Sequence, residues 1–259
     1  MESTIKVEKS ENKKNKNSII EFISKWGTVI TIVFLVALFG ALMPTTFLTM
    51  SNMTTILRGI SIVTVIAIGV TISLTVNGFD LSVGSTATFA TSLVMTMFVW
   101  YGMSTFTSIG LALLVALVVA AVNSFLTYTK HGRYMYAVGG NLEAARLSGI
   151  PVEKYRALAY FLSTLFASMG GILIAARVGS AQINAGAGYL MPAVAAAYIG
   201  FSFAGSGKAN AIGTLVGALL VGILENGLVM MSVPYYSLDI VKGAVLAIAL
   251  ASTYFRKKN

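Results

Sequence analysis

Long apolar stretches separated by short polar ones make up most of the chain. A helix needs about 20 apolar residues to cross the hydrocarbon core of a membrane. The stretches therefore predict membrane-spanning helices, eight in all. Their predicted bounds are about 27–43, 59–76, two helices within 81–129 that are joined by a turn at 101–104, then 157–176, 189–203, 211–230 and 240–255.

The composition agrees with this pattern. Of the 259 residues, 56% are hydrophobic and only 10% are charged, whereas a soluble domain carries about 25% charged residues. A single soluble core of this size cannot hold so much apolar surface. These proportions exclude soluble enzymes and DNA-binding domains, and the absence of cysteine excludes disulfide-bonded scaffolds. The expected fold is an all-α, polytopic helix bundle in a lipid bilayer.

The charged residues are concentrated in a few places. Six of the 18 basic residues precede Trp26, and three more lie at 256–258. Between these ends, half of the 14 charged residues fall within 130–156. A basic excess confined to two ends and one loop argues against a nucleic-acid partner. It is typical of the cytoplasmic side of a membrane protein.

The charge pattern also predicts the topology and the domains. Eight spans place both termini on the same side of the membrane as the 130–156 loop, and all three are basic. Residues 1–26 are then a basic cytoplasmic tail, and 27–259 form the membrane domain. Arg177 is the exception, because it falls on the outer side.

Few side chains offer catalytic or metal-binding chemistry. The single histidine, His131, lies in the basic loop, where a lone histidine is seldom a ligand. The segment 205–208 (GSGK) resembles the end of a phosphate-binding loop. However, Ser202 stands where that loop needs a glycine, and Ala209 stands where it needs Ser or Thr. We therefore expect no metal, no cofactor and no ATP site of this kind in the chain.

The first polar break is NGFDLSVG (77–84), which separates two long apolar stretches. Irregular backbone in a membrane must be buried by protein or line a water-filled cavity. An acid there, Asp80, is a functional candidate by default. Equally, the segment is an ordinary turn at the membrane face in which Asp80 caps the next helix.

The seventh predicted span, 211–230, contains two further features. Gly213 and Gly217 form a small-xxx-small pair, which is expected to let helices pack closely. Glu225 and Asn226 then interrupt the apolar run. The acid is either at membrane depth, where it must be paired or hydrated, or interfacial because the span ends near Leu224. The sequence leaves both open.

The 130–156 loop predicts a short, capped helix over 142–148. Gly139–Gly140 provide a flexible lead-in, and Asn141 is a favourable N-cap. Glu143 lies in the first turn, where the helix dipole favours an acid. Gly149 is suited to the C′ position.

A helix of about two turns is unstable alone in water, so it must pack against something. One possibility is its own bundle or the lipid surface. The other is a cytoplasmic partner protein, which is favoured by the mixture of small, acidic and basic residues. The residues predicted to dock the partner are Gly139, Gly140, Asn141, Glu143, Ala144, Ala145, Arg146 and Gly149.

This loop carries a family resemblance. GRYMYAVGGNLEAARLSGI (132–150) resembles the coupling-helix region of ribose-type sugar ABC importer permeases, in the branched-chain amino-acid/ribose permease superfamily. GFDLSVGS (78–85), the stretch 175–207 and GTLVGALLVGILENGL (213–228) also resemble that family.

The resemblance implies a bacterial inner-membrane importer for a monosaccharide or related solute. Two permeases, identical copies or paralogues, would form the pore, and a separate ATPase would dock on 139–149. An extracytoplasmic solute-binding protein would deliver the solute. The residues assigned to the translocation pathway are Asn77, Asp80, Ser82, Glu225 and Asn226.

The chain departs from the family in length. Members have about ten helical segments, and residues expected between Asn123 and Lys130 are missing here. Losing an even number of spans preserves the topology. Two other functions stay open: an ion-coupled secondary transporter with Asp80 or Glu225 as proton carrier, and an intramembrane enzyme using these acids and Asp239.

Overall fold

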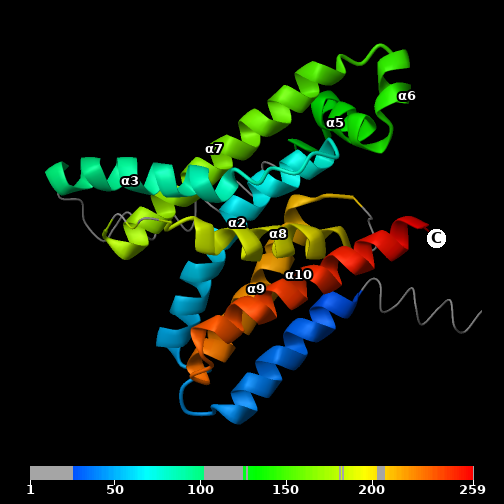
Figure 1. The fold of residues 1–259 in the computed structure, drawn as a ribbon. Coiled ribbons are helices and arrows are strands. Elements are labelled where there is room, and N and C mark those ends of the chain that lie inside the picture. The colour runs from blue at the N-terminus through cyan, green and yellow to red at the C-terminus, as the bar shows by residue number, and fades with distance from the viewer. Residues whose placement is uncertain are drawn as a thin grey trace, which may run out of the picture.

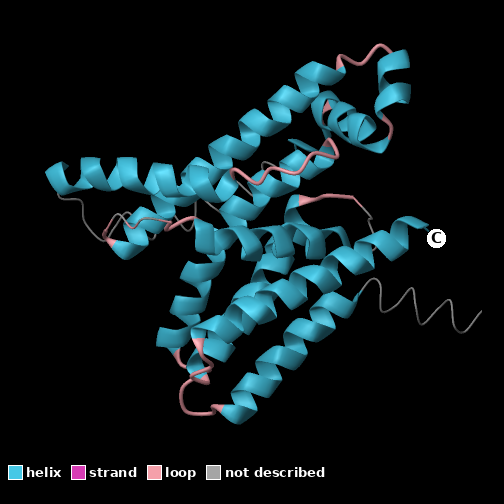
Figure 2. Ribbon diagram, in the orientation of Figure 1, coloured by secondary structure: helices cyan, strands magenta, loops and turns pink. Residues whose placement is uncertain are grey.

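The computed structural model is helical throughout the part of the chain that it describes, with no strand there (Figure 2). The basic tail expected before Trp26 lies outside this part, as do nearly all of the turn expected at 101–104 and part of the 123–130 segment. The described residues are 26–101, 125–126, 128–180, 182, 184–202 and 208–258.

Figure 1 shows the described helices coloured in chain order. The first is an apolar helix, Trp26–Leu42. The others are α2 (Met50–Thr75), α3 (Val83–Tyr101), α5 (Lys130–Gly140), α6 (Leu142–Leu147), α7 (Val152–Val178), α8 (Ala187–Ser202), α9 (Ala211–Met230) and α10 (Tyr235–Lys258).

Three described helices, α2, α7 and α9, are long and apolar enough to cross a membrane. Two shorter apolar helices accompany them, Trp26–Leu42 and Ala187–Phe201. The chain is therefore an integral membrane protein built as an all-helical bundle. The count of eight spans and the side on which the termini lie stay predictions.

Most helix bounds lie close to their predicted positions, and α9 matches 211–230. The largest difference is α2, which begins nine residues before the predicted 59. The hydroxyl of Thr49 caps this earlier start by accepting the backbone N–H of Asn52 at 3.3 Å. Apolar length marks only the part of a helix that lies in lipid, so a polar first turn such as 50–58 is missed.

The helix α2 lies at the centre of the bundle and packs against α7, α8 and α9. Small residues allow these close approaches, as predicted for the small-xxx-small pair. A Cβ added to Gly213 would overlap the carbonyl oxygen of Gly200, and one on Gly217 would overlap that of Ala196. The backbones of α8 and α9 therefore touch, which only small residues permit.

Candidate functional site

The short helix α6 begins as predicted. The side chain of Asn141 caps it by accepting the backbone N–H of Ala144 at 2.9 Å. Glu143 lies in the first turn, next to the positive end of the helix dipole. The cap satisfies one of the N–H groups that a helix start leaves without a partner.

The end of α6 is a Schellman motif. Gly149 has φ of 78° and donates its N–H to the carbonyl of Arg146 at 3.0 Å. The next residue, Ile150, donates to the carbonyl of Ala145, also at 3.0 Å. These two bonds and the left-handed glycine define the motif, so the predicted C′ role of Gly149 is confirmed.

One side of α6 packs on the protein and the rest is exposed. Ala145 is only 4% exposed and belongs to an apolar cluster with Met135, Val138 and Val152. Leu147, in contrast, is 86% exposed. The packing on its own bundle is thus observed through Ala145, and docking on a partner protein stays a prediction.

The expected flexible glycine lead-in is wrong. Gly139 and Gly140 are the last residues of α5, a helix of 11 residues that sequence reasoning missed. The Thr at position 129 is a sequence signal for its start, because Thr is a favourable N-cap residue. In the structure, the hydroxyl of Thr129 accepts the N–H of Gly132 at 3.1 Å. The glycines and charged residues gave the segment the composition of a loop.

Contacts with α7 also hold α5 in place. Nδ1 of His131 and the hydroxyl of Tyr155 form a hydrogen bond of 3.0 Å. The ring of Tyr134 packs edge-on against the ring of Tyr155, with centroids 5.4 Å apart. The lone histidine therefore joins two helices near α6.

The first polar break is a turn between α2 and α3. Asn77 is left-handed, with φ of 55°. Asp80 is 6% exposed, and its Oδ1 accepts the N–H of Ser82 at 2.9 Å and the hydroxyl of Ser82 at 2.6 Å. Asp80 therefore forms an Asx turn with Ser82, ahead of the first residue of α3, rather than the predicted cap on that helix.

The structure brings this break and the predicted coupling segment together. A Cβ added to Gly139 would overlap the carbonyl oxygen of Thr75 and lie 3.1 Å from the backbone nitrogen of Asn77. Figure 1 shows α5 and α6 at the end of α2, beside the start of α7. The end of α5 therefore packs against the backbone that leads into the turn carrying Asp80.

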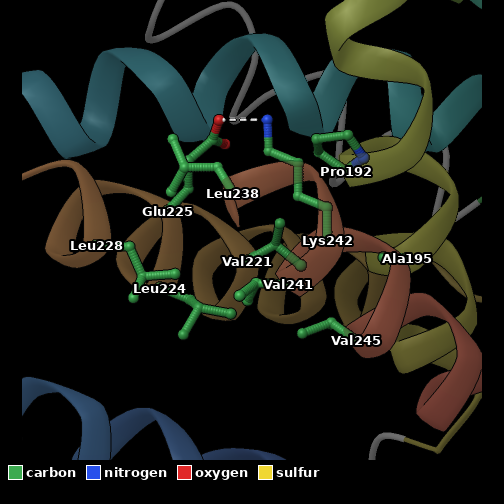
Figure 3. Close-up of a pocket in the computed structure, with 10 residues that line it drawn as sticks. All are labelled: Pro192, Ala195, Val221, Leu224, Glu225, Leu228, Leu238, Val241, Lys242 and Val245. Carbon is green, nitrogen blue, oxygen red and sulfur yellow. Dashed lines mark ion pairs between the residues drawn. The ribbon is translucent and has the colours of Figure 1, made fainter. Parts of the chain in front are cut away.

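The second polar feature lies inside an unbroken helix. The helix α9 continues to Met230, past Leu224, where one of the two alternatives placed the end of the span. Glu225 forms an ion pair of 2.8 Å with Lys242 of α10 (Figure 3). The pair lies at the edge of a small apolar pocket between α8, α9 and α10. Its other lining residues are Pro192, Ala195, Val221, Leu224, Leu228, Leu238, Val241 and Val245.

The predicted pathway residues separate into two places. Asn226 donates its side-chain N–H to Oδ1 of Asn52, at the start of α2, at 3.1 Å. Thr75, next to the first break, is at the other end of the same helix, about 35 Å away at 1.5 Å per residue. The two polar features therefore do not form one site.

The described residues hold no group of three or more His, Asp or Glu side chains placed to bind a metal. Of the glycine turn at 205–208, the structure describes only Lys208, whose Nζ lies 6.0 Å from the ring centroid of Tyr136.

Apolar spanning helices and a small capped helix seated at the end of the bundle define an integral membrane protein. Comparison with known proteins identifies the family to which the chain belongs. The chain belongs to the family described as "Branched-chain amino acid transport system / permease component", whose sequence model matches residues 117–250, just over half of the chain.

Several curated proteins are similar to this chain. The ribose import permease protein RbsC of Escherichia coli (strain K12) is 46% identical over 125 residues, which are 48% of this chain and 39% of that protein. The xylose transport system permease protein XylH of Haemophilus influenzae is 34% identical over 160 residues, 61% of this chain and 43% of that protein. These matches span less than half of each relative.

A longer match supports the predicted shortening. The ribose import permease protein RbsC of Haemophilus influenzae is 28% identical over 321 aligned positions, covering 96% of this chain and 99% of that protein. The alignment is longer than the 259 residues of this chain, so the chain lacks residues that the relative has within the aligned region. No solved structure matches the chain.

Proposed function

We propose that the chain is the membrane-spanning permease subunit of an ATP-binding-cassette importer. It translocates a monosaccharide or a related small polar solute and takes its energy from a separate ATPase. The family membership and the ribose and xylose permeases among its relatives support this assignment.

The observation that carries the proposal is α6. A helix of six residues is unstable alone, yet this one is capped at both ends and packed by Ala145 against the bundle. Its outer side exposes Leu147, with Glu143 and Arg146 nearby in sequence. A small apolar anchor flanked by charges suits a groove on a partner protein. The ATPase therefore docks on 139–149.

The remaining topology follows from this docking. The platform formed by α5 and α6 lies in the cytoplasm, eight spans return the chain to that side, and residues 1–26 form a cytoplasmic tail before the permease domain, 27–259. The membrane is a bacterial inner membrane. A second permease, identical or paralogous, completes the pore, and an extracytoplasmic solute-binding protein delivers the solute.

The geometry weighs against the ion-coupled alternative. A proton carrier needs an acid that gains and loses its proton during transport. Glu225 is instead ion-paired with Lys242, and Asp80 accepts two hydrogen bonds from Ser82. Both carboxylates are therefore already engaged by partners within the protein. The enzyme alternative needs a nucleophile paired with a base. Oδ1 of Asp239 instead lies 3.8 Å from Nζ of the same Lys242.

The deciding experiment is uptake in proteoliposomes. The chain is reconstituted with an ATPase and a solute-binding protein of a ribose-type importer, and labelled ribose or xylose is supplied. ATP-dependent uptake that persists when the ion gradients are abolished is the expected result. Uptake that needs a proton gradient and ignores the ATPase would overturn the proposal in favour of a secondary transporter.

A further inference from the structure

The helix α5 lies between the ends of two spanning helices. At its C-terminal end, Gly139 touches the carbonyl of Thr75, where α2 ends. One turn earlier, the hydroxyl of Tyr136 donates a hydrogen bond to the backbone carbonyl of Ala209. Ala209 is 2% exposed and lies two residues before the start of α9. The missed helix thus contacts both α2 and the start of α9.

The segment that Tyr136 holds is itself the anchor of α9. Oδ1 of Asn210, the N-cap residue, accepts the N–H of Gly213 at 2.5 Å. Its side-chain nitrogen donates to the carbonyl of Gly200, in α8, at 3.2 Å. Because one residue caps α9 and binds α8, a displacement of Ala209 moves the start of one helix and the end of the other.

The two spanning helices that α5 contacts are also joined to each other. The hydroxyls of Thr71 and Thr214 form a buried hydrogen bond of 2.6 Å between α2 and α9. The links from α5 to α2, from α5 to α9 and from α2 to α9 therefore close a triangle. A closed triangle moves as a unit, whereas an open chain of contacts would bend.

The Tyr136 link is chemically robust. Burial raises the pKa of the Tyr136 hydroxyl to about 12. The group stays protonated, and so remains a donor, throughout the physiological pH range. Its partner is a backbone carbonyl, which a substitution at Ala209 would not remove.

We propose that Tyr136 is a positioning residue for transport: its hydroxyl transmits displacement of the α5–α6 platform to the start of α9 and, through Asn210, to α8. The inference rests on the proposed function, because the displacement comes from the docked ATPase. The contact between Tyr136 and Ala209 gives a route from α5 to α9 that does not pass through α6. The ATPase docks on residues 139–149, whereas Tyr136, which transmits the movement, lies outside that segment.

The test is Tyr136→Phe, which removes only the hydroxyl, in the complete importer. Tyr134→Phe is the matched control, since it lies on the same helix and packs by its ring. In Tyr136→Phe, ATPase co-purification and ATP turnover stay near the unsubstituted values. Solute transported per ATP hydrolysed falls about fivefold, the factor that one hydrogen bond supplies. The control keeps the full ratio.

A purely structural role of Tyr136 would lower protein yield, ATP turnover and uptake together. The ratio of solute transported to ATP hydrolysed therefore separates a positioning role from a structural one. An unchanged ratio in folded Tyr136→Phe would overturn the inference while leaving the proposed function intact. A failure of the proposed function is distinguishable, because the unsubstituted chain would then show no ATP-dependent uptake at all.

A second measurement needs no Tyr136 substitution. The chain contains no cysteine, so Lys130→Cys and Ile212→Cys introduce unique spin-label sites at the starts of α5 and α9. Both residues are exposed. The distance between the labels should stay constant between nucleotide-free and ATP-bound importer, because the two helices move together. A change between these states would contradict the triangle directly.

Discussion

Single residues determine whether α6 exists as a helix. Gly149 has a left-handed backbone that side chains with a Cβ rarely adopt, and Asn141 supplies the only side-chain cap that the structure shows at the helix start. The interior of this helix has too few hydrogen bonds to sustain it. Its docking competence is therefore sensitive to changes at its two ends.

Gly149→Pro should abolish the helix end, because proline fixes φ near −65° and cannot take the observed 78°. We expect co-purification of the ATPase to fall at least about tenfold while membrane insertion is unchanged. Pull-down from solubilised membranes measures this. Gly188→Ala is the control, since Gly188 lies outside the docking segment and a Cβ there meets open space. Equal co-purification of both variants would contradict the role of α6.

Glu143→Arg tests the charge of the exposed side of α6. Reversing the charge at the positive end of the dipole costs about 0.5 kcal/mol of helix stability, which the Asn141 cap limits. We expect weaker ATPase co-purification with insertion intact. Glu153 forms an ion pair with Arg146 of α6 at 3.6 Å, so the control is instead Lys154→Glu, a charge reversal at an exposed residue outside the docking segment. A loss as large in the control would show a general charge effect instead.

At the scale of elements, α5 is the piece that joins the platform to the bundle. It contacts α2 through Gly139, α7 through His131 and α9 through Tyr136. Its Gly132 and Gly139 allow close packing, whereas Gly140 meets open space. The Thr at position 129 and the spacing of Met135 and Val138 are signals that could have predicted the helix.

Gly139→Val should force α5 away from the end of α2, because the new side chain would overlap the carbonyl of Thr75. Overpacking of this kind costs about 1–3 kcal/mol. Thermal unfolding in detergent should show a lower midpoint than for the unsubstituted chain. Gly140→Val has open space and should change the midpoint little. Equal midpoints for the two variants would exclude the close contact.

At the scale of the whole molecule, the polar residues are divided between the two ends of α2. The platform and the Asp80 turn lie at one end, and the Glu225–Lys242 pair and the Asn226–Asn52 bond lie toward the other. The side chain of Lys242 is 13% exposed and is paired with Glu225 within the protein. The pair therefore acts as a link between α9 and α10.

Glu225→Gln distinguishes this link from a proton carrier. The substitution removes one charge of the pair but leaves Asp239 at 3.8 Å from Lys242. We expect a lower thermal midpoint and uptake that is still driven by ATP. Complete loss of uptake in a well-folded variant, with ATP turnover unchanged, would instead favour a proton-carrying acid. Asp239→Asn, which removes the longer contact, is the control.

The sequence alone determined the features that depend on local chemistry. Apolar length predicted the spanning helices, because lipid requires it. The residue types at 141, 143 and 149 predicted α6, because caps act through bonds within a few residues. The family was recognisable from the same segment and is confirmed by the profile match to residues 117–250.

Only the tertiary structure decided what depends on distant partners. It turned Gly139–Gly140 from a lead-in into a helix packed on α2, paired Glu225 with a lysine 17 residues away, and joined Tyr136 to Ala209. Whether an acid is paired, or a glycine touches another backbone, is fixed by residues far away in the chain. Side-chain type and local spacing do not contain that information, because packing forms these contacts only when the helices meet.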